Sequence, residues 1–169
     1  MRIWQEMRLP AMVLALTAVL AGQGVAEEIR AGCYQRIYSD QHLRDNPDQV
    51  VWQMRLKVGN GLAAGEREAV MEVIAANQGH ARRDDNNGRV FTQGLICLDD
   101  AGTARCQVEC DGGGFEVTRQ DGDGLTFATD YLMVGEGDGC GGVMDLAEKV
   151  GVTVKYRLNR VGDAVCSGM

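Results

Sequence analysis

Two cysteines and a triple glycine stand close together in the stretch CQVECDGGGF, residues 106–115. A cysteine pair at short spacing is typical of a zinc or a redox site, and a glycine-rich turn can cradle a phosphate. The same residues can also build a disulfide-anchored β-hairpin. The rest of the sequence decides among these possibilities.

The spacing of the sulfur and imidazole groups disfavours metal and thiol chemistry. A zinc site uses four nitrogen or sulfur ligands, usually in two close pairs. Here Cys106 and Cys110 form one loose pair, and the two histidines, His42 and His80, lie in separate polar segments. A redox C-x-x-C motif is absent. We therefore expect no metal and no cofactor, and we interpret both histidines as solvated loop residues.

The glycine-rich turns also fail as anion or calcium sites. The turn at 111–114 lacks the Lys-Ser/Thr of a P-loop and precedes an expected strand, not a helix. The acidic clusters before Gly88 and Gly124 place an arginine, Arg83 or Arg119, where an EF-hand loop needs its first oxygen ligand. We interpret these clusters as turns.

Hydrolytic chemistry finds little support. Beyond the N-terminal leader the only serines are Ser39 and Ser167, and neither lies in a G-x-S-x-G setting. Carboxylates are abundant, but they gather in glycine turns where solvation is the default. We expect a protein that is not an enzyme, and we keep a small periplasmic hydrolase using Asp and Glu as an alternative.

The N-terminus has the pattern of a secretory signal peptide. Arg2 and Arg8 precede an uncharged apolar run at 11–21, and small residues follow at the cleavage position. That run is about 11 residues, whereas a spanning helix needs about 20. We predict a signal peptide at 1–26, a single β domain at 27–169, and no membrane insertion after cleavage.

The charge balance limits the partners. The whole chain carries −7, and because the leader contributes +1 the remainder carries −8. Such an acidic chain repels phosphate backbones and anionic lipid, so we expect no nucleic-acid partner. The cations are nearly all arginine, a usage common in GC-rich bacteria. We therefore predict a secreted protein of the bacterial periplasm, whose partner is an unknown small ligand or protein.

Alternation of apolar and polar residues predicts β-strands. In 50–58, Trp52, Met54, Leu56 and Val58 fall on one face, which we expect to point inward. In 152–159, the corresponding inward residues are Val152, Val154, Tyr156 and Leu158. Further candidate strands are 90–98, 104–110, 114–119 and 125–130. The pattern predicts an all-β fold, a single antiparallel meander of about seven or eight strands that forms a barrel or a sandwich.

Three segments carry helical signals. Residues 66–76 (EREAVMEVIAA) have high helix propensity, yet Met71, Val73 and Ala75 also form one face of a strand. We favour the strand, because 50–58 would otherwise lack a partner. Short helical turns are expected at 39–43, capped by Ser39, and at 144–149.

Six cysteines in an exported chain predict three disulfides. Cys106 and Cys110 on an extended strand would be about 13 Å apart at Cα, whereas a disulfide needs under about 7 Å. A two-residue turn at Ala101-Gly102 places Cys97 opposite Cys106 and Leu95 opposite Val108, so we predict a Cys97–Cys106 bridge.

The remaining cysteines allow looser assignments. We assign Cys140–Cys166, which would attach the glycine-rich loop to the C-terminal tail. We also assign Cys33–Cys110, which would attach the N-terminal segment.

Two features could bind a partner. The polar loop 77–89 offers His80, Arg82, Arg83, Asp84 and Asp85, and the glycine-rich loop 135–142 is a second long connection. A barrel interior could instead hold a small apolar ligand, lined by Trp52, Met54, Phe91, Phe115, Phe127 and Tyr156, or these side chains could fill a solid core. We expect a non-enzymatic binding or interaction module, with a structural envelope protein as a further alternative.

The Cys-Tyr start at Cys33, the strand meander and the Cys-Asp-Gly-Gly-Gly turn at 110–114 resemble small secreted bacterial proteins of uncharacterised function. The resemblance runs from Cys33 to Cys166 and implies no activity. Size, strand count and a late cysteine are also similar to lipocalin-type barrels. The lipocalin G-x-W signature is missing, since Trp52 follows two valines, so this second likeness concerns architecture alone.

Overall fold

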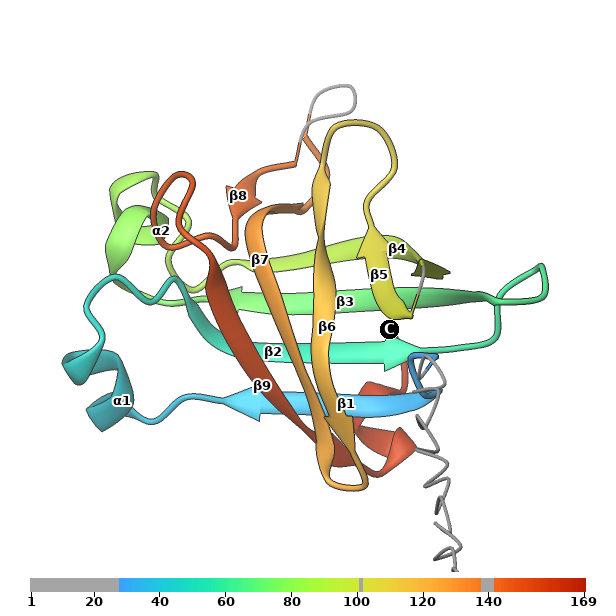
Figure 1. Cartoon of the computed structure of the whole chain (residues 1–169). Helices are drawn as coiled ribbons and strands as arrows, with labels where there is room; N and C mark the ends of the chain where they lie inside the picture. The colour runs from blue at the N-terminus through green and yellow to red at the C-terminus, as the bar shows by residue number, and fades with distance from the viewer. Residues whose placement is uncertain (1–27, 101, 138–141) are drawn as a thin grey trace, which may run out of the picture.

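The computed structural model describes residues 28–100, 102–137 and 142–169, so the predicted signal peptide at 1–26 lies outside the described residues. The domain is an all-β closed antiparallel barrel of eight strands, with a short ninth strand beside it (Figure 1). The strands are β1 (Gly32–Ile37), β2 (Val51–Val58), β3 (Glu66–Ala75), β4 (Val90–Asp100), β5 (Thr103–Gln107), β6 (Gly113–Asp121), β7 (Gly124–Val134), β8 (Met144–Asp145) and β9 (Val154–Val161). The helices are α1 (Asp40–Asp45), α2 (Gly79–Arg83) and the 3-10 helix η1 (Asp163–Cys166).

The strands follow one another around the barrel, which confirms the predicted meander. Each of β1 to β7 pairs with the next in sequence, and β9 lies between β7 and β1 and closes the ring. The short β8 pairs only with the end of β7. Of the two architectures that the sequence left open, the barrel is therefore the one adopted.

The segment with mixed helix and strand signals is the strand β3, as we favoured. Its buried residues are Ala69, Met71, Val73 and Ala75, which alternate along the strand. β3 pairs with β2 on one side and β4 on the other. Two full ladders of backbone hydrogen bonds outweigh a local helix propensity that amounts to tenths of a kcal/mol per residue.

Trp52 does not point inward, so that prediction is wrong. The β2–β3 register passes from Val51↔Ala75 directly to Gln53↔Ile74, which leaves Trp52 as the extra residue of a β-bulge. A bulge shifts the alternation by one residue, so Val51 is buried and Trp52 is 38% exposed. Met54, Leu56 and Val58 remain on the inner face as predicted.

Because of the bulge, Trp52 and Met54 should contribute differently to the free energy of unfolding. We expect Trp52→Ala to cost less than about 1 kcal/mol of the free energy of unfolding, because the side chain leaves no internal cavity. Met54→Ala should cost about 2–5 kcal/mol, because Met54 is fully buried. Urea denaturation followed by circular dichroism measures both values. A larger loss for Trp52→Ala than for Met54→Ala would contradict the bulge.

The two predicted helical turns have different outcomes. The first is α1, where the Ser39 side chain accepts a hydrogen bond from the His42 N–H. The second, at 144–149, is wrong. Asp145 accepts hydrogen bonds from the N–H groups of Leu132 and Ala147, both at 3.0 Å, and this holds the segment extended as β8 followed by bends.

The last strand begins later than its alternation predicts. β9 starts at Val154, and Val152 is 53% exposed because it lies in the connection before the strand. Tyr156 and Leu158 are buried as expected.

Aromatic side chains fill the middle of the barrel. The rings of Phe115 and Phe127 lie 4.4 Å apart, and those of Phe127 and Tyr156 lie 5.3 Å apart. The Tyr156 hydroxyl donates to the Leu146 carbonyl at 2.8 Å, and burial raises the pKa of that hydroxyl well above its usual value. Met54 and Phe91 belong to the same buried cluster. At these positions the barrel interior is packed with side chains.

Candidate functional site

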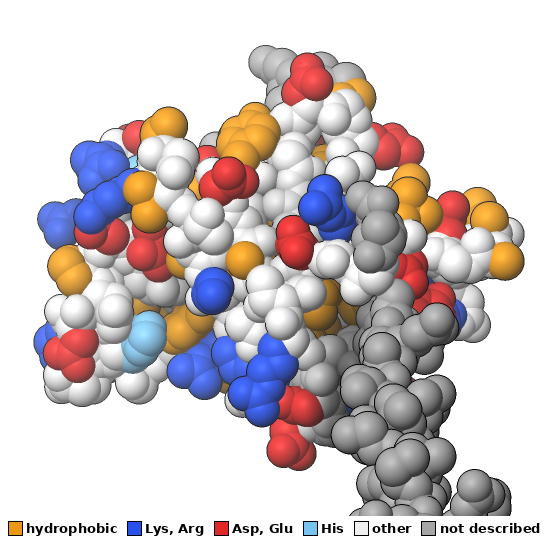
Figure 2. Space-filling view, in the orientation of Figure 1, with side chains coloured by type: hydrophobic (Ala, Val, Ile, Leu, Met, Phe, Trp, Pro, Cys, Tyr) orange, Lys and Arg blue, Asp and Glu red, His pale blue; other side chains and the backbone are white. Residues whose placement is uncertain are grey.

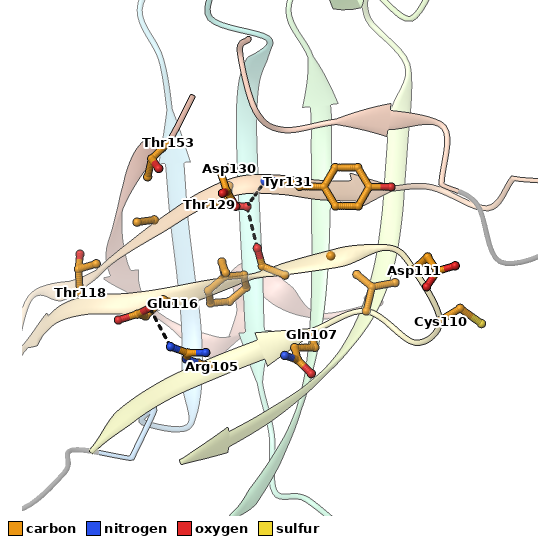
Figure 3. Close-up of a pocket in the computed structure, with 15 residues that line it drawn as sticks. Arg105, Gln107, Cys110, Asp111, Glu116, Thr118, Thr129, Asp130, Tyr131 and Thr153 are labelled. Carbon is orange, nitrogen blue, oxygen red and sulfur yellow. Dashed lines mark hydrogen bonds and ion pairs between the residues drawn. The ribbon is translucent and has the colours of Figure 1, made fainter. Parts of the chain in front are cut away.

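A concave region lies on the outer face of the barrel over β5, β6 and β7, and we call it the outer hollow (Figure 3). It is open to solvent and has a volume of about 720 Å³. Among its lining residues are Arg105, Gln107, Gly114, Glu116, Ala128 and Tyr131.

Cross-strand pairing explains how the rim forms. Gln107 pairs with Gly114, and Gly114 pairs with Tyr131, so these three residues form one row across the strands. In β5 and β6 the neighbouring residues Cys106 and Phe115 are buried, so Gln107 and Gly114 face outward, and Tyr131 is 46% exposed. Long side chains at both ends of the row flank a glycine at its centre.

In the next row along the strands, the small residue lies at one end. Arg105 pairs with Glu116, and Glu116 pairs with Ala128. The Arg105 and Glu116 side chains form an ion pair at 3.5 Å, with each about half exposed. Because Gly114 has no side chain and Ala128 has only a methyl group, the floor between the two rows lies low.

A second bulge turns Asp130 and Tyr131 toward solvent together. Thr129 and Leu132 on either side are buried, so the alternation of β7 breaks here. The Thr129 hydroxyl donates to the Gly114 carbonyl at 2.7 Å and accepts from the Tyr131 N–H at 3.2 Å, as the dashed lines in Figure 3 show. These two bonds fix the backbone at the edge of the hollow.

The triple glycine serves close packing. A Cβ on Gly112 would lie 2.5 Å from the Val108 side chain, and one on Gly113 would lie 2.6 Å from the Tyr131 ring. A Cβ on Gly114 would overlap the Cys106 carbonyl. Gly113 also has a φ of +72°, which favours glycine. The turn at 111–114 thus lets β6 pass tightly between β5 and β7.

The disulfides confirm one predicted pair and correct two. Cys97 and Cys106 are bridged, at the predicted register of Asp100↔Thr103 and Cys97↔Cys106. The predicted pairing of Leu95 with Val108 does not form, because the β4–β5 ladder ends at Ile96↔Gln107.

Cys33 is bridged to Cys166, so the assignments Cys33–Cys110 and Cys140–Cys166 are both wrong. The pairing follows from η1, which returns the chain end to β1 and β2, where Arg55 donates to the Val165 carbonyl. Cys140 lies outside the described residues.

The predicted strand 104–110 ends early. β5 stops at Gln107, and Cys110 lies exposed in the following turn with a φ of 61°. Its sulfur is part of a disulfide, and Cys110 is among the residues that line the outer hollow. Cys106 and Cys110 therefore do not share an inward face. The physical reason is the tight turn that brings Gly113 back to accept the Val108 N–H at 3.0 Å.

Of the six residues that we considered for an interior ligand, five are buried and only Trp52 faces outward. Met54, Phe91, Phe115, Phe127 and Tyr156 are each no more than 4% exposed. They come together in one core cluster. Only Phe115 also lines the outer hollow, at its base.

The loop 77–89 is ordered around α2. Ala81 and Asn86 are buried, and the Asn86 N–H donates to the Ala81 carbonyl at 2.8 Å. His80 is not solvated, since its side chain is 17% exposed and its Nε2 lies 3.0 Å from the Ala147 carbonyl oxygen. Arg82, Arg83, Asp84 and Asp85 are exposed, and none of the predicted loop residues lines the outer hollow.

The setting of the Glu148 carboxyl alters its acidity. Burial raises the pKa of Glu148, and the nearby Asp48 raises it further. His42 lies near this carboxyl and stacks on the Tyr38 ring at 4.6 Å, so it is only partly solvated. Asp48 is held by the Lys149 ammonium at 2.7 Å. Glu148 is not among the residues that line the outer hollow.

Metal-binding clusters, membrane-spanning helices and disulfides can each be assessed in the described residues. Within them, no group of three or more His, Cys, Asp and Glu side chains is placed to hold a metal ion. In the same part of the chain, no helix has the length and apolar character needed to cross a bilayer. The disulfides indicate an oxidising compartment outside the cytoplasm.

Sequence reasoning missed the outer hollow. Arg105 and Gln107 were predicted to lie on a strand, but their side chains were assigned no role. The signals were present, because counting outward from the turn at 101–102 already places Arg105 and Gln107 on the face opposite Cys106. No pattern in the sequence indicated the bulge that exposes Tyr131.

The chain matches no protein-family model, no curated protein and no solved structure. Fold and site therefore define a class only: a disulfide-bonded, eight-stranded antiparallel β-barrel of an oxidising compartment, with a concave region on its outer face. The likeness to lipocalin-type barrels concerns this architecture alone.

Proposed function

We propose that the protein is a non-enzymatic binding module of the bacterial periplasm and that its ligand lies in the outer hollow. The observation that carries this proposal is the hollow itself, about 720 Å³ with charged, amide, hydroxyl and aromatic groups around a low floor. Ligand pockets are typically about 300–1,000 Å³ and combine apolar surface with a few directed polar groups. The barrel interior is a weaker candidate, because the aromatic side chains there pack against one another.

The construction of the hollow favours binding. Its floor rests on three paired strands, with the Cys97–Cys106 bridge joining β4 to β5 beside it. Thr129 fixes the bulge that presents Tyr131. A site whose backbone is already in place loses less conformational entropy when a ligand binds.

The periplasmic location rests on two separate features. The predicted signal peptide at 1–26 implies export, and the disulfides require an oxidising compartment. The arginine-rich, lysine-poor composition supports a bacterial origin.

Filling the floor of the hollow is expected to weaken binding. The test titrates the ¹⁵N-labelled exported chain with three probe pools: capped peptides, soluble oligosaccharides and medium-chain fatty acids. One of the first two pools should shift the amide resonances of Gly114, Ala128 and Tyr131. Ala128→Leu should weaken that binding by at least about tenfold, because the larger side chain occupies the floor.

Thr126→Leu is the matched control. Thr126 lies two residues from Ala128 on the same strand, outside the hollow. The Thr126→Leu variant should therefore bind the ligand as the wild type does. Shifts produced by fatty acid at Phe127 and Tyr156 would favour the interior instead. No shift from any pool, or equal binding by Ala128→Leu, would contradict the proposal.

A further inference from the structure

The outer hollow carries an excess of negative charge. Its described lining includes three carboxylates, Asp111, Glu116 and Asp130, and one cation, Arg105. Glu116 is balanced by Arg105 at 3.5 Å. Among the described residues neither Asp111 nor Asp130 has an ion-pair partner, and both are exposed. Figure 2 shows acidic side chains over this part of the face, whereas basic side chains gather near α2 at the left.

An exposed aromatic ring lies beside this charge. Tyr131 is 46% exposed, and its ring packs over Gly113, which carries no side chain. In Figure 3 the ring extends toward the end of the hollow where Asp111 lies. A tyrosine face attracts ammonium and guanidinium groups, and carboxylates pair with them. Together they form a setting for a lysine or arginine side chain.

The surroundings suit a chain rather than a single ion. Beyond Gln107 and Arg105, the adjacent strand β4 presents Ile96 and Leu98, which are 38% and 49% exposed. These residues continue the two outward rows, so an apolar shelf adjoins the charged hollow. The hollow is also several times larger than one side chain.

We propose that the outer hollow binds a short extended peptide segment that carries lysine or arginine. This inference rests on the proposed function and adds the class of ligand. The basic side chain lies on the Tyr131 ring toward Asp111, while Asp130 adds negative charge on the other side of Tyr131. A neighbouring apolar residue of the segment lies on Ile96 and Leu98. The net charge of −8 on the exported chain favours the approach of such a ligand.

Isothermal titration with capped pentapeptides tests the inference. The probes are acetyl-Gly-Leu-X-Leu-Gly-amide with Arg, Gln or Glu at X, together with spermidine and a soluble oligosaccharide. The Arg peptide should bind at least about tenfold more tightly than the Gln peptide. Its affinity should fall between about 50 mM and 500 mM salt, because exposed charges are screened.

Matched variants locate the effect. The double variant Asp111→Asn/Asp130→Asn should lose about tenfold in affinity for the Arg peptide, and Tyr131→Leu should lose severalfold, while Tyr131→Phe retains binding. The control Asp84→Asn/Asp85→Asn removes the same charge at the exposed end of α2. It should change affinity by less than about twofold, because those carboxylates lie outside the hollow.

Each other outcome overturns the inference. Equal binding of the Arg and Gln peptides, tighter binding of the Glu peptide, or equal losses in the two double variants would remove the cationic specificity. If spermidine bound and the Arg peptide did not, the assignment of a peptide as the ligand would be refuted. In each of these cases the outer hollow still binds a ligand, so the proposed function stands although the peptide inference falls. The same holds if only the oligosaccharide binds at Ala128 and Tyr131. If no probe shifts the resonances of the hollow, both proposals fall.

Discussion

Replacing Cys33 and Cys166 together by alanine is expected to lower the free energy of unfolding by about 5 kcal/mol. The bridge joins residues 133 positions apart, nearly the full length of the described domain. In the chain-entropy account, a long closed loop restricts the unfolded chain most strongly. Guanidinium denaturation without reductant measures the loss.

The second bridge provides the control. Cys97 and Cys106 are 9 positions apart, and the same account assigns about 3 kcal/mol to so short a loop. Cys97→Ala/Cys106→Ala should therefore unfold at a higher denaturant concentration than Cys33→Ala/Cys166→Ala. Equal midpoints, or the reverse order, would show that loop closure is not what the long bridge contributes.

Gly113→Ala is expected to destabilise the domain by about 3–5 kcal/mol. Part of this loss comes from the φ of +72°, which an alanine adopts at a cost of about 1–2 kcal/mol. The larger part comes from the new methyl group, which would overlap the Tyr131 carbonyl and lie 2.6 Å from its ring. Thermal and chemical denaturation measure the change.

Gly88→Ala separates the two contributions. Gly88 has the same φ of +72°, but a Cβ there meets nothing within 4 Å. This variant should lose only about 1–2 kcal/mol. If Gly113→Ala lost no more than Gly88→Ala, the close packing of the turn against β7 would be refuted.

The cysteine results show where counting along the sequence works. The Cys97–Cys106 bridge follows from a tight turn between adjacent strands, since a two-residue turn fixes the register locally. The Cys33–Cys166 bridge joins β1 to the chain end after η1. That contact depends on how β9 closes the barrel and where η1 returns the chain, which no local rule specifies.

The two bulges show the same limit at the level of single side chains. Trp52 fits the alternation of its strand and was predicted to point inward. It is the extra residue of the bulge in β2, however, and it faces outward. At Asp130 and Tyr131, a bulge held by Thr129 exposed two successive residues. In both cases the residues after the bulge alternate again, and only the pairing with neighbouring strands reveals the shift.

The sequence by itself determined the class of the fold. Alternation and turn residues act locally, and they are enough to specify an antiparallel meander and the bridge of one hairpin. The strand β3 followed from the meander, because 50–58 needed a partner. The outer hollow was decided only by the tertiary structure. It requires the small residues Gly114 and Ala128 to lie in neighbouring rows of β6 and β7, with the longer side chains of Arg105, Gln107, Glu116 and Tyr131 around them. Such a meeting depends on register and bulges between strands, which are long-range properties of the folded barrel.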